Sequence, residues 1–492
     1  MQNNNEKVFK SMHSQTLVTL MQGVLEMVNF SIMSRILTKE DFGYFALLTA
    51  VTVVLSSLTE AGIGSAVIQK KNPDQTYINT SFSISLGLGS LFSIILFWGA
   101  DAFSLLMTGN GTLALAFRIM SISLMLQGYN NIYNALKIRQ LEFFKLGMYR
   151  VSSMFIAYCI GIILALKGYG FYAIVITDIT NHLIYTIILH LNSRKIDLKI
   201  RFDSSRFKDI FQFGGLLTIT VIIRNITEQT DRFLVGRLLG VNSVGILNRP
   251  GGFVNTISSK INGIFDTILF PILSSMQDSS EKIKIAFNKS VALVLFSSVV
   301  LCSFVILGSK FIIDIFFGSQ WQSIYKLLWV FGTILIFSGV NRICDCFFRS
   351  LAIMKSYLFV RIINCIGLIS LVYFGCLYGI LGVALAKLFA EALSVGVKIT
   401  ILEHHIQCGY NSILKYIINN CFGIFCLSAA CFLLMTLIPY GNLIFIFIYI
   451  TILLLIAFIK PFFFGELFVE NIYNRYLIPI KSKFKKNDKA IS

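Results

Sequence analysis

Long apolar segments alternate with short polar connections along almost the whole chain. Fourteen segments have about the 20 apolar residues that an α-helix needs to cross the hydrocarbon core of a bilayer. They form a set of six, a second set of six and a final pair: 15–33, 42–68, 78–98, 113–136, 147–166 and 170–189; 210–234, 244–273, 287–317, 324–348, 358–377 and 379–401; 416–438 and 443–463. The pattern predicts an all-α polytopic membrane protein with about 14 transmembrane helices, or 12 if one pair is re-entrant.

Basic residues concentrate in every second connection. Lys70, Arg139, Arg201, Lys284 and Arg349 belong to the basic connections, Arg361 at the start of the next span is counted with them, and the tail at 481–489 is also basic. The connections at 100–112 and 439–442 contain no Lys or Arg. Since Lys and Arg collect in cytoplasmic loops, both termini are expected on the cytoplasmic side.

The two sets of six segments predict two lobes. The expected divisions are an N-terminal lobe at 1–192, a cytoplasmic linker at 193–209, a C-terminal lobe at 210–402, and the last two helices with the tail at 403–492. A short repeat agrees, because Arg35 and Gly43 recur at the same spacing as Arg237 and Gly245 after the first span of each set. Repeats six spans apart are parallel, so a pseudo-twofold axis along the membrane normal is expected. Within the linker, the sequence permits a short surface helix capped by Asp203 or Ser204, or a plain basic loop.

Composition excludes an ordinary soluble protein. Of the 492 residues, 56% are hydrophobic and 13% are charged, about half the usual charged share of a soluble domain. The net charge of +18 would suggest nucleic acid in a soluble protein, but here the basic loops account for it and no nucleic-acid partner is expected. No phosphate-binding GxxxxGK[ST] loop, HExxH or CxxC motif occurs, so neither an ATPase, a metal site nor a cofactor is predicted.

Polar residues inside the predicted spans mark the candidate site. In the first span, Gln22, Glu26 and Asn29 lie on one helical face, a stripe more typical of a water-filled cavity than of helix–helix contacts. The second set carries more charge, including Arg224–Glu228, Arg342–Asp345 and Lys387–Glu391 at helical spacing. Each of these can be a neutralising pair. As a set they favour a polar, cationic cavity, because a charge at mid-bilayer costs at least about 2.5 kcal/mol.

The chemistry of these side chains suggests an anionic, polyhydroxylated substrate. Guanidinium groups bind phosphate oxygens bidentately, amides suit sugar hydroxyls, and intramembrane carboxylates often hold a proton or an ion. The candidates are Arg224, Arg232, Lys260, Arg342 and Lys387 for the anionic headgroup; Glu26, Glu60, Asp178, Glu228, Asp231 and Asp266 for ion or proton coupling; and Gln22, Asn29, Asn130, Asn134, Asn255 and Asn262 for sugar contacts. Among the acids, Glu26 and Glu60 are preferred to Glu228 for coupling, because no cation lies near them in the sequence.

Several motifs resemble those of a known family. They are Arg35-Ile-Leu-Thr-Lys-Glu-Asp-Phe-Gly43, Gly62-Ile-Gly64, Ile68-Gln-Lys-Lys71, Asp231-Arg-Phe-Leu-Val-Gly236, Leu269-Phe-Pro271 and Phe317-Gly-x-x-Trp321. Together they resemble bacterial polysaccharide exporters of the lipid-linked oligosaccharide flippase type, in the multidrug/oligosaccharidyl-lipid/polysaccharide superfamily, and most of all the colanic-acid and teichuronic-acid branch. One departure is Leu-Asn-Arg-Pro at 247–250, where an aromatic residue followed by Asn-Arg-Ala is common and where Pro250 could shift the start of the eighth span.

The resemblance implies a function without bond chemistry. It implies a flippase, not an enzyme, that moves a polyprenyl-diphosphate-linked oligosaccharide repeat unit across the bacterial inner membrane by alternating access, for O-antigen or exopolysaccharide synthesis. Its expected partners are this substrate, membrane lipid, and a complex with a polysaccharide polymerase and chain-length regulator. Two alternatives stay open: an ion-coupled multidrug or small-molecule antiporter of the same superfamily, and a membrane-embedded polymerase or glycosyltransferase.

Overall fold

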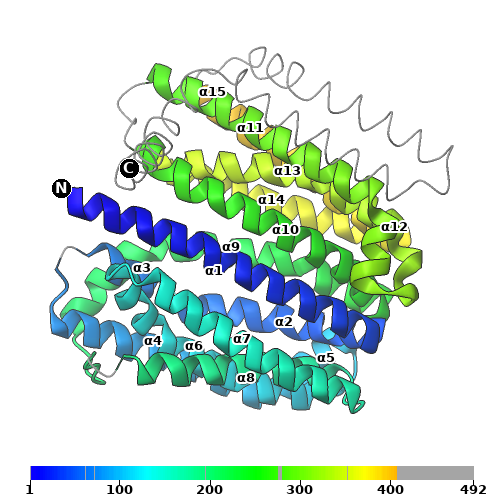
Figure 1. Cartoon of the computed structure of the whole chain (residues 1–492), viewed down its shortest axis with the longest axis horizontal. Helices are drawn as coiled ribbons and strands as arrows, with labels where there is room; N and C mark the ends of the chain where they lie inside the picture. The colour runs from blue at the N-terminus through cyan, green and yellow to red at the C-terminus, as the bar shows by residue number, and fades with distance from the viewer. Residues whose placement is uncertain are drawn as a thin grey trace, which may run out of the picture.

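The structure, a computed structural model, is a bundle of long helices that run roughly side by side (Figure 1). It describes residues 2–60, 62–70, 72–193, 196–274, 280–351 and 353–406, with side chains for all of these except 2–16, 211–218, 260–274, 280, 282 and 354. The first helices are α1 (Gln2–Ile36), α2 (Lys39–Glu60), α3 (Ile63–Gln69), α4 (Gln75–Trp98), α5 (Ala100–Thr108), α6 (Ala114–Arg139), α7 (Phe143–Leu166) and α8 (Phe171–Leu191). The others are α9 (Ser204–Leu239), α10 (Val241–Ser274), α11 (Ser280–Leu307), α12 (Ser309–Ile312), the turns η1 (Ile313–Phe317) and η2 (Ser319–Ile324), α13 (Tyr325–Ser350), α14 (Met354–Cys376) and α15 (Gly379–Ile406).

Each of the first twelve predicted spans coincides with helix. Nine helical segments in the described ranges are long and apolar enough to cross a membrane. The helices α6, α9 and α10 are more polar, but their 26, 36 and 34 residues also exceed the roughly 20 that a span requires. The predicted spans 416–438 and 443–463 lie outside the described residues.

Two local expectations were wrong. The segment 287–317 is not one helix, because α11 ends at Leu307 and the chain continues through α12 into the π-helical turn η1. Asp203 does cap a helix, and the bond from Ser205 to its carboxylate lowers the pKa of that group. However, this helix is α9 itself rather than a short surface helix, because the helix that begins at Ser204 continues without a break to Leu239.

The helices gather in two halves that meet along α2 (Figure 1). Helices α2–α8 lie in one half, where α4 packs on α6 and α7 on α8. Helices α10–α15 lie in the other, where α11 packs on α13 and α14 on α15. Because α2 packs against both α9 and α10, the halves are joined at this point.

The repeated glycines permit this contact. A Cβ atom on Gly43 would lie 2.0 Å from the carbonyl oxygen of Val241, and one on Gly245 would lie 1.8 Å from that of Lys39. Both distances are far below van der Waals contact, so any side chain there would push α2 and α10 apart. The two copies of the repeat therefore pack against each other.

Next to these glycines, Arg249 of α10 joins the halves through a group of residues that we call the junction: Phe30, Ser34, Phe42, Arg249 and Trp321. The guanidinium of Arg249 lies between two aromatic rings, 3.6 Å from the ring centroid of Phe30 and 3.8 Å from that of Phe42. It donates to the Ser34 hydroxyl at 2.7 Å and to the Phe30 carbonyl at 2.9 Å. Trp321 donates to the Ser34 carbonyl at 2.9 Å. Pro250 follows Arg249 inside α10 and does not delay the start of this helix, which begins at Val241.

Candidate functional site

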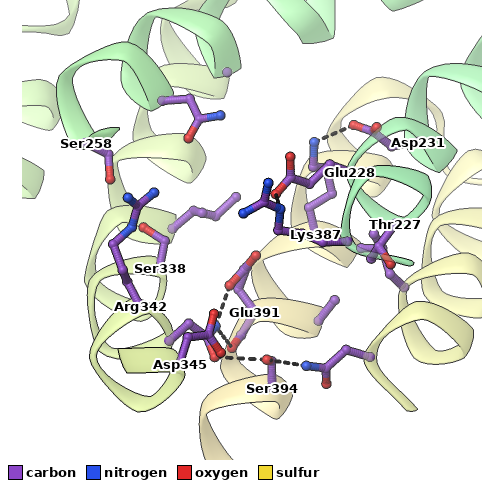
Figure 2. A pocket seen from close by; sticks show the side chains of 18 of the residues that line it. Thr227, Glu228, Asp231, Ser258, Ser338, Arg342, Asp345, Lys387, Glu391 and Ser394 are labelled. Atoms are coloured by element: carbon purple, nitrogen blue, oxygen red, sulfur yellow. Dashed lines mark hydrogen bonds and ion pairs between the residues drawn. The ribbon is translucent and has the colours of Figure 1, made fainter. Parts of the chain in front are cut away.

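A polar cavity of about 510 Å³ lies among helix α9 and four helices of the second half (Figure 2). Its walls are formed by α9, α10, α13, α14 and α15. One end begins at Leu247 and Asn248, directly beside the junction, and the lining extends to Arg349 and Lys398. Helices α9 and α10 supply much of this lining, which accounts for polar residues within them.

The described lining of the cavity has an excess of positive charge. The basic residues are Arg224, Arg232, Arg342, Arg349, Arg361, Lys387 and Lys398, and the acidic residues are Glu228, Asp231, Asp345 and Glu391. Seven cations therefore face four carboxylates. In a site with low-dielectric walls, such an excess produces a focused positive potential that attracts anions.

Asp345 is the centre of one ion network. Its carboxylate lies 2.6 Å from the Arg361 guanidinium and 2.8 Å from the Lys398 ammonium. Arg361 also donates to the Tyr357 hydroxyl at 2.8 Å. Only 2% of the Lys398 side chain and 15% of that of Asp345 are exposed. This network joins α13, α14 and α15, and its burial makes Asp345 important for folding.

A second ion pair corrects an interpretation of the sequence. Lys387 of α15 binds the carboxylate of Asp231 on α9, whereas its spacing along the helix predicted a pair with Glu391. The difference arises because α15 packs against α9, which brings a carboxylate from another helix to Lys387. The predicted pair Arg224–Glu228 is present, with its closest atoms 3.8 Å apart.

Glu391 is held by the side-chain amide of Asn341. Its carboxylate accepts a hydrogen bond of 2.5 Å from the Asn341 amide. The Ser394 hydroxyl donates to the Asn341 side-chain oxygen at 2.9 Å, and Asn364 donates to Ser394 at 2.7 Å. Figure 2 shows Glu391 and Ser394 on this side of the cavity. Amides and a carboxylate in one chain offer both donors and acceptors, as sugar hydroxyls require.

The cavity brings together seven of the residues that the sequence singled out. They are Arg224, Arg232, Arg342 and Lys387 among the headgroup candidates, Glu228 and Asp231 among the acids, and Asn255 among the amides. The side chains of Lys260, Asn262 and Asp266 lie outside the described residues. Gln22, Asn29, Asn130, Asn134, Glu26, Glu60 and Asp178 belong to α1, α2, α6 and α8 and do not line this cavity.

Several polar residues of the first half make contacts between helices. Asn130 donates to the Thr186 hydroxyl at 2.7 Å, and Asn134 accepts from the Tyr185 hydroxyl at 2.5 Å. These two bonds connect α6 with α8, which is the helix–helix role that the sequence also permitted. Glu60 is subject to the charges of Arg150 and Arg224, so the absence of a nearby cation no longer favours it for coupling.

Three cations of the cavity, Arg349, Arg361 and Lys398, were not among the predicted site residues. Arg349 and Arg361 were assigned to a basic connection, and Lys398 was not considered. Arg361 and Lys398 each lie within an apolar helix, in α14 and α15. A charge within the bilayer is costly, which made Arg224 a candidate, and the same cost makes Arg361 and Lys398 candidates.

Comparison with known proteins identifies the family. The profile of the family described as "Polysaccharide biosynthesis protein" matches residues 32–326, which is more than half of the chain. The chain belongs to this family. The matched region includes the repeat, every junction residue except Phe30, and the α9 and α10 walls of the cavity.

Individual relatives agree with the assignment. The chain is 22% identical to "Lipopolysaccharide biosynthesis protein WzxC" of Escherichia coli (strain K12), over 82% of this chain and 81% of the relative. It is 24% identical to "Putative O-antigen transporter" of Shigella flexneri, over 72% of this chain and 88% of the relative. Among solved structures, "Lipid II flippase MurJ, inward closed conformation" has the same fold, with a TM-score of 0.71, 17% identity, and coverage of 94% of this chain and 99% of the other.

These findings define the protein at a coarse level. It is a multi-pass membrane transport protein of polysaccharide biosynthesis, and it is not an enzyme. The hypothesis of a membrane-embedded polymerase or glycosyltransferase is thereby excluded.

Proposed function

We propose that this transporter moves a polyprenyl-diphosphate-linked oligosaccharide repeat unit from the cytoplasmic to the outer leaflet of the bacterial inner membrane. The observation that carries the proposal is the excess of cations over carboxylates in the described lining of the cavity. A diphosphate is a compact polyanion, and desolvated guanidinium groups bind its oxygens bidentately. The names of the two curated relatives support a substrate from lipopolysaccharide or O-antigen synthesis.

Each part of the substrate has a proposed place. The diphosphate binds to Arg224, Arg232, Arg342 and Lys387, with Lys260 as a further candidate. The sugars contact Asn255 and the amides beside Glu391, with Gln22, Asn29, Asn130, Asn134 and Asn262 as candidates at other stages of transport. The prenyl tail stays in the lipid, because burying it in a polar cavity would forfeit its hydrophobic stabilisation.

Removal of a cavity arginine tests the headgroup site. We expect the single variants Arg224→Ala, Arg232→Ala and Arg342→Ala to weaken binding of a polyprenyl diphosphate about tenfold to a hundredfold, since a hydrogen bond to a charged group contributes about 1.5–3 kcal/mol. Arg→Lys variants should fall between Ala and the parent, because they keep the charge and lose the bidentate geometry. The measurements are binding to purified protein and recovery of surface polysaccharide in a strain that lacks the parent gene, with membrane protein levels determined in parallel.

Arg118→Ala is the matched control for these variants. Arg118 of α6 pairs with Asp101 of α5 at 2.6 Å. Neither residue lines the cavity, so the loss of Arg118 should leave binding unchanged. If all three cavity variants are well expressed and restore full polysaccharide, the cations are structural and the headgroup site is elsewhere.

The same cavity disfavours an antiporter of cationic drugs. A binding site for a cation needs an excess of carboxylates, and the described lining has the opposite balance. The shared fold alone does not separate the two functions. A displacement experiment on the purified protein separates them. Inorganic diphosphate should displace a bound polyprenyl diphosphate and should not displace a bound organic cation.

Ion coupling is proposed for at least one of Glu26, Glu60, Asp178, Glu228, Asp231 and Asp266. Glu26 and Asp178 lie near Tyr158, and Asp178 lies 3.8 Å from His182, so these acids share one polar region of the first half. We expect Glu26→Gln combined with Asp178→Asn to reduce transport and its dependence on an imposed proton or sodium gradient. Transport into proteoliposomes with and without the gradient measures this. Unchanged gradient dependence in the double variant would remove both acids from the proposal.

We propose that both termini are cytoplasmic and that 14 helices form two pseudo-symmetric lobes, at 1–192 and 210–402, followed by a last pair and the tail in 403–492. The basic connections support this orientation. In a cysteine-free background, a cysteine in place of Asn110 should react with an impermeant thiol reagent added to intact cells whose outer membrane is permeabilised. A cysteine in place of Ser204 should react only after the inner membrane is opened. The reverse labelling pattern would overturn the orientation.

A further inference from the structure

The connection between α8 and α9 is an extended segment held along the surface of α4. We call residues 196–203 the strap. Side chains of α4 form hydrogen bonds with its backbone. Gln75 donates to the carbonyl of Asp197 at 2.6 Å, and Ser83 accepts from the amide of Arg201 at 2.8 Å and donates to its carbonyl at 2.9 Å. The amides of Lys199 and Asp203 donate to Asn79 at 3.1 Å and to Thr80 at 3.2 Å. The strap therefore follows α4 for more than two helical turns.

The position of Ser83 indicates the depth of the strap. Helix α4 has 24 residues, which span about 36 Å at 1.5 Å per residue, only slightly more than the hydrocarbon core of about 30 Å. Ser83 lies eight residues, or about 12 Å, from the start of α4. Irregular backbone at such a depth requires protein partners in place of water. The α4 side chains supply those partners, so the strap is suited to the boundary between headgroups and acyl chains.

The side chains of the strap point in two directions. Ile196 and Leu198 pack against the core of the first half, together with Tyr77 and Phe82. Ile200 and Phe202 face outward and are 76% and 63% exposed. Phe202 also contacts Phe207 in the first turn of α9, with ring centroids 5.7 Å apart, so the exposed apolar surface continues onto that helix.

The charges beside this surface differ in their partners. Lys199 lies 3.0 Å from Asp197, which neutralises it. Arg206 pairs with Asp74 at 2.8 Å. Arg201 and Lys208 are exposed and have no acidic partner among the residues that the structure describes. Within the described part of the chain, two cations that lack an acidic partner thus flank three exposed apolar side chains, Ile200, Phe202 and Phe207.

We propose that the strap and the first turn of α9 form a binding surface for anionic phospholipid. Ile200, Phe202 and Phe207 lie among the acyl chains, and Arg201 and Lys208 contact the headgroup phosphates of the same leaflet. Apolar residues interleaved with cations are the arrangement that interfacial segments use, because burial and attraction to anionic lipid then act together. The linker between the two halves is thereby anchored to the membrane surface.

Lipid quenching of a new tryptophan tests the apolar part. Phe202→Trp is introduced into the full chain and reconstituted in vesicles of phosphatidylcholine and phosphatidylglycerol. The parent protein, with Trp98, Trp321 and Trp329, is the blank. The difference emission should be blue-shifted, quenched by lipids brominated near the carbonyl end of the acyl chain, and insensitive to acrylamide. Strong acrylamide quenching without bromolipid quenching would place Phe202 in water or in an aqueous entrance and would overturn the proposal.

Neutral substitutions test the ionic part. The measured quantity is the ratio of Phe202→Trp quenching by brominated phosphatidylglycerol to quenching by brominated phosphatidylcholine. In the Phe202→Trp background, Arg201→Gln with Lys208→Gln should lower this ratio at least about twofold, since each surface cation contributes about 1 kcal/mol to attraction by anionic lipid. Lys199→Gln is the matched control and should leave the ratio unchanged, because Asp197 neutralises Lys199. An equal ratio in the control and the double variant means that lipid binds without headgroup recognition, which contradicts the assignment to anionic lipid.

Discussion

Replacement of Asp345 by Asn is expected to lower the free energy of unfolding by about 3–5 kcal/mol, the usual cost of leaving a buried charge unpaired. Lys398 is almost fully buried, and both it and Arg361 depend on this carboxylate. The melting temperature of the purified protein in detergent, followed by intrinsic fluorescence, should therefore fall clearly. The variant Asp101→Asn is the control, because it breaks the exposed pair with Arg118 and should cost less than about 1 kcal/mol.

A second substitution separates the charge effect from a packing effect. If the loss arises from an unpaired ammonium, Asp345→Asn combined with Lys398→Met should recover much of it, since apolar replacements of buried ion pairs are often neutral or stabilising. A double variant that melts no higher than the single one would show that the Asp345 carboxylate stabilises the fold in some other way. A single variant as stable as the parent would contradict the role of Asp345 directly.

The spans were predictable because the membrane imposes one requirement on each of them. Each span must be an apolar segment that is long enough to cross the bilayer as a helix, and such segments can be recognised in the sequence. The first twelve of them coincide with helix. The end of α11 was missed because the interruption by Gly308, Ser309 and Lys310 is only three residues long and apolar residues resume at Phe311. A hydropathy pattern averaged over the length of a span does not resolve so short a break.

The cavity was predictable in its residue types and less so in its partners. The positions of Arg224 and Arg342 inside apolar segments were enough to suggest a cationic site. The partner of Lys387 was not, because Asp231 lies 156 positions away in the sequence and only the packing of α9 on α15 brings them together. For the same reason Asn130, a candidate for sugar contacts, was not expected to bind Thr186 on a neighbouring helix. The periodicity of a sequence shows which residues share one face of a helix, but it does not show which residues of other helices pack against that face.

Arg249 was not singled out from the sequence, because only its neighbours Leu247 and Pro250 depart from the family pattern. No carboxylate of the described residues pairs with it, and its charge is held by two aromatic rings, a carbonyl and a hydroxyl. All of these groups belong to α1 or to α2. The free energy of the Arg249 contacts therefore depends on the two halves being together at the junction, next to one end of the cavity.

The second large effect is expected from Arg249→Ala. A desolvated cation–π contact contributes about 2 kcal/mol, and hydrogen bonds from a charged group contribute about 1.5–3 kcal/mol each. Allowing for non-additivity, we expect the junction to lose about 3–4 kcal/mol, or roughly a hundredfold to a thousandfold in the equilibrium between its closed and separated forms. Amide hydrogen exchange of residues 30–42 should accelerate correspondingly, and transport should fall because the two halves no longer stay together beside the cavity.

Arg237→Ala is the matched control, because Arg237 occupies the equivalent repeat position of Arg35, is exposed, and makes no contact with the junction rings. Its exchange in residues 30–42 should match that of the parent. Arg249→Lys should be intermediate, since an ammonium keeps the charge but cannot stack between Phe30 and Phe42 while bonding Ser34. Unaltered exchange in Arg249→Ala would mean that the glycine contact between α2 and α10 closes the junction by itself. Intermediate behaviour of the lysine variant would instead show that the planar guanidinium, and not charge alone, keeps the two halves together.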